Sequence, residues 1–209
     1  MFIDFIFENQ IKQNQNIKQV KNHYIKIREL IHKEIKEEKR HVKFGLSPFG
    51  IWRPGFPTSV EGFDQYDKLY ADAKLWLNKG WIDYFTPQLY WPSYKINTSF
   101  PVLLGWWQSE NTHQRHLWPG INTANDKNIL LNNQEVISEI MITRGMLPKS
   151  PGVVHWSMSA LTKNPSLTKE LNEGVYKNAS TGKSQSNYRK DRPYQFVKDL
   201  TLEEVTRIA

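Results

Sequence analysis

Aromatic and amide side chains follow each of four predicted strands, and their types point to one kind of ligand. Flat indole and phenol rings stack on the apolar C–H faces of sugar rings, while amide, guanidinium and hydroxyl groups reach the sugar hydroxyls. A carbohydrate is therefore the predicted ligand. The side chains predicted to bind it are Trp52, Arg53, Gln88, Tyr90, Trp91, Asn122 and Trp156.

The alternative interpretation of the tryptophans is that they fill the protein core. We expect this for Trp76, Trp81 and Trp107, which lie on or beside predicted helices. Trp52 and Trp91 are different, because each lies close to a proline in a loop that leaves a strand. Long strand-exit loops often carry function, so for these two a ligand site is the favoured interpretation.

The acidic residues fit glycoside hydrolysis less well, since that reaction normally needs two carboxylates flanking the scissile bond. Glu61, in the long loop after the first strand, is the candidate catalytic acid, although a loop acid can equally be a solvated side chain. Asp83 begins a strand, where a structural role is expected. Asp72 is predicted to be a hydrogen-bonded helix residue. The catalytic residues are otherwise unknown.

Composition and motifs argue against several other functions. The 209 residues include no cysteine, no nucleotide-binding glycine motif and no zinc-protease motif, so we predict neither a metal nor a cofactor. The net charge of +7 comes with mixed-sign helix faces such as residues 33–40, which argues against a nucleic-acid partner. No apolar run is long enough to span a membrane, and the first residues lack a secretory signal pattern.

The elements that must position these side chains follow a regular order. Apolar spacing predicts helices over about 17–38, 65–78, 100–112, 133–144 and 167–176. Predicted strands begin near residues 43, 83, 117 and 153, at intervals of about 40, 34 and 36 residues. Strands that alternate with helices at such a period are typical of parallel βαβ units, so the α/β class is predicted.

Four βα units are half of what an eight-stranded barrel requires. The predicted fold is thus a partial (β/α)8 TIM barrel, comprising about its last four βα units. Left alone, such a sheet would expose an edge and a face, so a completing partner is expected. The predicted segments are a non-matching amino-terminal stretch (1–16), the half-barrel (17–177), and a flexible linker with a short helical tail (178–209).

Several motifs in the correct order give this chain a resemblance to glycosyl-hydrolase-like family 10, a bacterial and cyanobacterial family. They are Phe44–Gly55, Leu69–Asp72, Asp83–Tyr84, Pro87–Trp91, Pro119–Asn122 and Val154–Ser157. The resemblance covers roughly residues 18–177. It implies a TIM-barrel glycoside hydrolase of the cell envelope that cuts peptidoglycan strands stripped of their peptides, an N-acetylated glycan.

The resemblance also implies that this chain corresponds to the carboxyl-terminal half of the barrel. The family's acidic candidates lie near the end of the fourth strand, before the matched region, so the chain alone is expected to lack the catalytic acids. A missing amino-terminal half-barrel or a second copy is the expected protein partner. The alternative is a non-catalytic carbohydrate-binding half-barrel or an inactive remnant. Localisation stays unknown, since the family implies the envelope and the chain shows no signal peptide.

Overall fold

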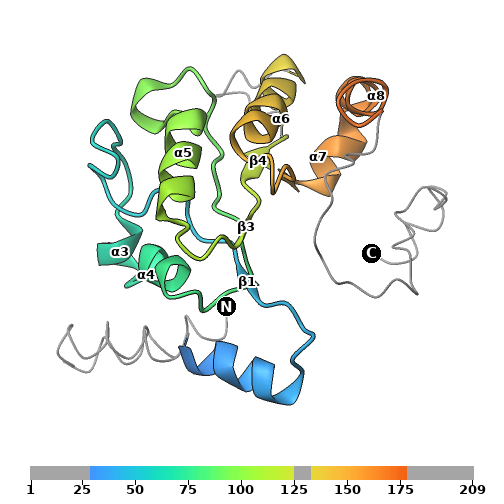
Figure 1. Ribbon diagram of the computed structural model, residues 1–209. Helices are drawn as coiled ribbons and strands as arrows, with labels where there is room; N and C mark the ends of the chain where they lie inside the picture. The colour runs from blue at the N-terminus through green and yellow to red at the C-terminus, as the bar shows by residue number, and fades with distance from the viewer. Residues whose placement is uncertain (1–28, 125–132, 178–209) are drawn as a thin grey trace.

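The computed structural model describes residues 29–124 and 133–177, which form helices and short parallel strands in alternation (Figure 1). Residues 29–38 are helical and precede the first strand. The elements that follow are β1 (Gly45–Leu46), α3 (Gln65–Lys68), α4 (Ala73–Asn78), β2 (Tyr84–Phe85), η1 (Ile96–Thr98), α5 (Phe100–Glu110), β3 (His116–Leu117), β4 (Gly120–Asn122), α6 (Asn133–Met146), β5 (Val154–Trp156), α7 (Met158–Lys163) and α8 (Pro165–Glu173).

This arrangement confirms the mixed α/β class with parallel strands. It does not by itself establish a barrel. The predicted amino-terminal stretch 1–16, the first part of the 17–38 helix and the tail 178–209 lie outside the described residues.

The strands line up in chain order. β1, β2 and β3 form one parallel sheet, and β4 and β5 form another. Gln88 joins the two sheets through a parallel bridge to Gly120, so β3 and β4 continue one another. The ladder is interrupted between them at Pro119, which has no N–H to donate, although its carbonyl still accepts a bond from the Val154 N–H at 2.9 Å.

Side chains alternate between the two faces of the first sheet. Leu46 and Phe85 are paired on neighbouring strands and face the helices, and Phe85 is completely buried. Gly45 and Tyr84 form the neighbouring pair on the opposite face. The Tyr84 ring lies against Gly45, where a Cβ atom would collide with it. Glycine at position 45 therefore lets the tyrosine lie flat on the opposite face.

The helices that follow each strand build the core on one side of the sheet. Trp107 of α5 packs on Phe85 with ring centroids 4.8 Å apart, and its indole donates to the Gly50 carbonyl at 2.7 Å. Ile140 of α6 and Leu167 of α8 are also buried in this core. Trp107 thus has the core position that its helical context predicts.

The predicted helix over 65–78 is two short helices, α3 and α4. Tyr70 adopts a φ of 52°, which no helix can accommodate, so the chain breaks there. Asp72 then caps α4, accepting a bond from the Leu75 N–H at 3.1 Å. The prediction of a hydrogen-bonded Asp72 is confirmed, with the correction that it lies at a helix start. Helix α7 was not predicted.

Asp83 has the structural role expected from its position before β2. Its Oδ2 atom accepts bonds from Lys36 Nζ at 2.6 Å and from the Phe44 N–H at 2.7 Å. Burial would raise the pKa of Asp83, but these two donors outweigh it and the pKa is lowered. The carboxylate therefore fastens helix 29–38 and the start of β1 to β2.

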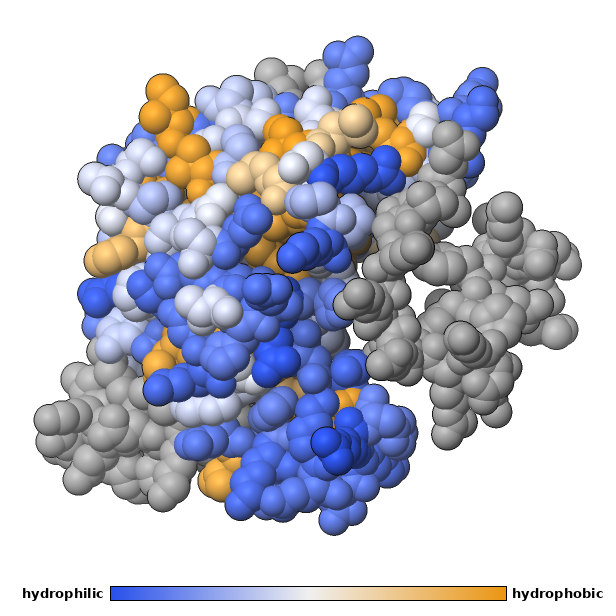
Figure 2. All heavy atoms as spheres, in the orientation of Figure 1, coloured by the Kyte–Doolittle hydropathy of each residue, from blue (hydrophilic) through white to orange (hydrophobic). Residues whose placement is uncertain are grey.

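The surface in this orientation is divided by hydropathy. Hydrophobic residues gather in the upper half of the view, over the region of α5 and α6, while the lower half is mainly hydrophilic (Figure 2). Within the described residues, none of the helices combines the length and the apolar composition that a membrane span needs.

Candidate functional site

Three predicted ligand-binding residues meet at the carboxyl ends of neighbouring strands. Asn122 ends β4 and lies in register with Trp156, which ends β5. The Trp156 ring faces that of Tyr90, with centroids 6.1 Å apart and planes inclined by 31°. Trp156 keeps 60% of its surface exposed, while Tyr90 is partly buried, which raises its pKa. We call Tyr90, Asn122 and Trp156 the strand-end group.

Backbone pairing explains why these residues converge. The Leu89 N–H donates to the Gly120 carbonyl at 3.0 Å, which sets the chain before Tyr90 beside β4. A Cβ atom on Gly120 would approach the Tyr90 ring to 3.1 Å, so glycine leaves room for the ring. The Asn122 Oδ1 atom accepts from the Ala124 N–H at 2.9 Å, a local turn that fixes the amide.

Gln88 belongs to the same end of the sheet. It bridges Phe49 on one side and Gly120 on the other, and its Nε2 atom donates to the Ser47 carbonyl at 3.1 Å. The amide is only partly buried. Gln88 therefore lies between the ends of β1 and β4, two residues before Tyr90 of the strand-end group.

Trp91 lies next to the loop that follows β1. Its ring meets Phe49 edge-on, with centroids 5.3 Å apart, and it packs close to Gly50. Trp91 is partly buried against the core. One side of this indole thus supports the β1 loop.

Trp52 and Arg53 form a separate cluster over α4 and α5. The Trp52 ring stacks on Trp106 with centroids 5.9 Å apart, and its Nε1–H donates to Asp72 Oδ1 at 3.1 Å. Arg53 pairs with Asp64 at 3.2 Å. Among the described residues, the ring contacts of Trp52 and the ion pair of Arg53 all lie within this cluster, so the structure does not bring Trp52 and Trp156 together.

Glu61 joins two loops at the carboxyl end of the sheet. It accepts a bond from Asn97 Nδ2 at 2.6 Å, and its own N–H donates to the Asn97 carbonyl at 3.0 Å. The carboxylate is exposed to solvent. These contacts give Glu61 a loop-tying role, and its part in catalysis stays a prediction.

The Glycosyl hydrolase-like 10 family matches residues 11–136. The chain belongs to this family. The match includes β1 through β4 and ends within α6, so Tyr90 and Asn122 lie inside it while Trp156 lies beyond.

Two of the most similar curated relatives are named as glycosyl hydrolases. The chain is 35% identical to glycosyl hydrolase YngK of Bacillus subtilis over 145 residues, which cover 65% of this chain and 28% of that protein. It is 39% identical to glycosyl hydrolase DigH of Escherichia coli K12 over 77 residues, covering 35% of this chain and 18% of the relative. The chain therefore spans less than a third of either relative.

A buried carboxyl group on α6 has no role among the predicted site residues of this glycosyl hydrolase-like protein. Glu139 on α6 is 1% exposed and its Oε2 atom has no hydrogen-bond partner in the described structure. Burial, and then the nearby Glu135 carboxylate, raise the pKa of Glu139 to about 9. The signal was present, because Glu139 continues the helical stripe of Val136 and Thr143.

His155 faces away from the strand-end group. Its Nε2 atom and the Tyr176 hydroxyl form a hydrogen bond of 2.7 Å, and burial lowers the pKa of the imidazole. Burial also raises the pKa of Tyr176 to about 12. We interpret this pair as packing between β5 and the end of α8, because both side chains lie on the helix-covered side.

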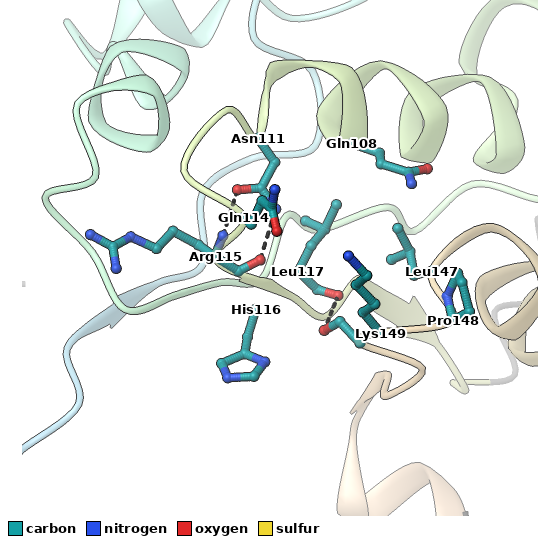
Figure 3. Close-up of a pocket in the computed structure, with 10 residues that line it drawn as sticks. Gln108, Asn111, Gln114, Arg115, His116, Leu117, Leu147, Pro148 and Lys149 are labelled. Carbon is teal, nitrogen blue, oxygen red and sulfur yellow. Dashed lines mark hydrogen bonds between the residues drawn. The ribbon is translucent and has the colours of Figure 1, made fainter. Parts of the chain in front are cut away.

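A cavity of about 800 Å³ opens at the other end of the sheet, where α5 ends and β3 begins. Figure 3 shows Lys149 extending toward Leu117 and Gln114, and Arg115 pointing away. Arg115 donates to the Gly80 carbonyl at 2.7 Å. Barrel enzymes bind substrate at the carboxyl ends of their strands, so this cavity is not the candidate site of a family member.

The described residues offer no group of three His, Asp or Glu side chains that could hold a metal ion. The chemistry available at the strand-end group is therefore aromatic stacking and hydrogen bonding by an amide and a phenol.

Proposed function

We propose that this chain forms the carboxyl-terminal half of a (β/α)8-barrel glycoside hydrolase and binds an N-acetylated cell-wall glycan of the peptidoglycan type. The barrel is supported by parallel strands in chain order with helices between them. A closed barrel needs eight such units. The chain matches 28% of the length of YngK, so that relative has room for further units. The other units would come from a further stretch of chain or from a second copy.

The convergence of Tyr90, Asn122 and Trp156 is the observation that carries this proposal. Two aromatic rings, one at the end of β5 and one on the segment that follows β2, lie 6.1 Å apart at the end of the sheet where barrel enzymes bind substrate. The exposed indole of Trp156 offers a flat apolar surface to a sugar ring. The Asn122 amide nitrogen offers a donor to a sugar hydroxyl or to an acetamido carbonyl.

The acid and base of hydrolysis would lie on the strands that complete the barrel. Glycosidic bond cleavage normally uses two carboxylates. Within residues 29–124 and 133–177, no carboxylate is hydrogen-bonded to a member of the strand-end group. We therefore propose that the chain alone binds glycan without cleaving it, and that the complete protein works in the cell envelope, where such a glycan is found.

The test is a fluorescence titration of the chain with chitooligosaccharides and with peptidoglycan glycan strands. Stacking on Trp156 should change the tryptophan emission, and Trp156→Ala should lower the affinity at least about fivefold, equivalent to ~1 kcal/mol. Met141→Ala, at a side chain with a similar exposure of 54% on α6, is the control. Absence of binding at millimolar glycan would overturn the proposal.

A non-catalytic carbohydrate-binding half-barrel is the second candidate. It is favoured because no carboxylate among the described residues is hydrogen-bonded to the strand-end group. Release of reducing ends from glycan strands separates the two. The chain would be assayed alone and together with the amino-terminal part of YngK. Cleavage that needs both parts supports the hydrolase, whereas binding without cleavage in the mixture supports the binding protein.

A further inference from the structure

The cavity of about 800 Å³ at the amino ends of the strands is not used by the proposed function. The end of α5, the start of β3 and the segment that joins α6 to β5 build its wall (Figure 3). Sites for small organic molecules have volumes of roughly 300–1,000 Å³. The cavity is therefore large enough for an organic ligand and much larger than a bare ion needs.

Positive charge dominates the lining of this cavity. Among the described residues, those that line it include Lys149 and Arg115 but no Asp or Glu. Neither cation forms an ion pair within the described part of the chain. Glu110, which ends α5 just beside the cavity, is already paired with Lys74 at 2.9 Å. The two positive charges are therefore not neutralised by a carboxylate of the described residues.

The carboxyl ends of α5 and α6 oppose this charge only in part. Both helices end beside the cavity, because Asn111 and Leu147, the residues that follow them, belong to its lining. A helix carboxyl end carries about half of a negative elementary charge, so the two ends offset about one of the two positive charges. The lining keeps an excess of roughly one positive charge, which an anionic ligand would neutralise.

Free hydrogen-bond donors accompany the charge. Lys149 extends toward Leu117 and Gln114, whereas Arg115 points away and contributes its charge rather than a contact (Figure 3). Gln108 and Gln114 are exposed, and their side-chain amides bond to no other described residue. One ammonium and two amide groups can donate to several acceptor atoms of one ligand.

We propose that this cavity is a binding site for a phosphate ester, with Lys149 holding the phosphate group. A phosphate group brings three strong acceptor oxygens, one more than a carboxylate, and so suits an ammonium with two amides. Leu117, Leu147 and Pro148 give the lining an apolar part for the rest of the ligand. The site lies at the opposite end of the sheet from the strand-end group, so it does not depend on the proposed glycan binding.

The ester is either a small soluble molecule or the headgroup of an anionic phospholipid, and the experiment distinguishes these two sources. The backbone and glutamine side-chain amide signals of the full, isotope-labelled chain are followed by NMR. In one arm glycerol phosphate is added at millimolar concentration, with sodium chloride of equal ionic strength as the reference. In the other arm vesicles of phosphatidylglycerol and phosphatidylcholine are added, with vesicles of phosphatidylcholine alone as the reference.

Two variants test the lining, and a third is the control. Lys149→Met removes the charge and nearly keeps the length of the side chain. Gln108→Glu places a carboxylate in the lining at an exposed position, where the fold tolerates it. Lys169→Met changes an exposed lysine of α8 that forms no ion pair within the described residues.

We expect at least one phosphate source to change the signals of Gln108 and Gln114 in the wild type and in Lys169→Met. Lys149→Met should weaken this binding about two- to fivefold, the range of an exposed ion pair, and Gln108→Glu should weaken it at least as much. A response to the anionic vesicles alone, with the same dependence on Lys149, assigns the site to a lipid headgroup.

The proposal is overturned if neither source changes these amide signals beyond its reference. It is also overturned if Lys149→Met binds as tightly as the wild type. Glycan affinity should be the same in all four proteins, because the strand-end group is untouched. Failure of the phosphate site therefore leaves the proposed glycan binding standing, and failure of glycan binding leaves the phosphate site standing.

Discussion

Trp156 and Tyr90 face each other across the end of β4, with ring centroids 6.1 Å apart, although one ends β5 and the other follows β2. Asn122 lies on the strand between them, in register with Trp156. Such a pair requires three neighbouring parallel strands to end at the same level. It is therefore the most direct sign in the structure that the strand ends form a common surface.

The first prediction concerns the coupling of these two rings. Tyr90→Ala and Trp156→Ala should each weaken glycan binding, and the double variant should lose less than the sum, because each ring holds the other in place. A double-mutant cycle should give a coupling of about 0.5–1.5 kcal/mol. Met141→Ala combined with Tyr90→Ala should be additive. Strict additivity of the first pair would mean that the rings bind independently.

The strand-end group could be predicted from sequence because it depends only on strand order. Regular βα spacing places the residues after each strand at one end of a parallel sheet, and Tyr90, Asn122 and Trp156 follow that rule. The register of β4 with β5 and the contact between the Tyr90 and Trp156 rings bring these three together in the structure. Their role in binding glycan stays a prediction.

Other features depend on contacts that no local pattern contains. The helix break at Tyr70 follows from a single φ of 52° inside an otherwise helical spacing. Trp52 carries the same local signals as Trp91, a nearby proline and a strand-exit loop. Its stacking partner Trp106 belongs to α5. That partner could not be identified without the fold, because it comes from a different βα unit.

The second prediction is that Trp52 anchors its loop. Trp52→Phe removes the bond to Asp72 and part of the stack on Trp106, so unfolding in urea should show a loss of about 1–2 kcal/mol. Glycan affinity should change less than about twofold, which is ~0.4 kcal/mol of binding free energy. A residue that does not stack on the sugar should have no larger effect. Trp156→Ala should show the reverse pattern. A large loss of affinity in Trp52→Phe would place this residue in the binding site.

The third prediction concerns acid stability. The pKa of Asp83 is lowered in the folded state, so its contribution to stability is present above the unfolded value of 3.8 and is lost as the pH falls through the folded value. Asp83→Asn should cost about 2 kcal/mol at pH 7, because the bonds from Lys36 and Phe44 lose their charge assistance. Urea unfolding from pH 7 to pH 2 measures both effects.

In the Asp83→Asn variant, stability should fall less steeply with acid than in the wild type. Glu37→Gln is the control, since the Glu37 side chain is 62% exposed and its ion pair within the described residues is with the exposed Lys33. A variant as stable as the wild type at pH 7 would show that the Lys36 contact adds nothing to stability.

Glu139 is a buried carboxyl group that stays protonated at neutral pH in the folded protein. Its pKa of about 9 lies far above the ordinary 4.5, mainly because burial disfavours the charged carboxylate. A raised folded pKa means that the folded state binds the proton more tightly than the unfolded chain. The stabilisation is therefore complete below about pH 4.5 and declines as the pH rises toward 9.

The fourth prediction follows from that sign. Between pH 5 and pH 9 the wild type should lose several kcal/mol of unfolding free energy, since each pKa unit corresponds to about 1.4 kcal/mol. Glu139→Gln keeps the shape and removes the titration, so its stability should vary much less over this range and should exceed that of the wild type at pH 9. Urea unfolding at pH 5, 7 and 9 gives the comparison, with the exposed Glu173→Gln as the control. Parallel profiles for wild type and Glu139→Gln would show that the carboxyl group ionises in the folded protein at its ordinary pKa, and therefore that water or a neighbouring donor reaches its Oε2 atom.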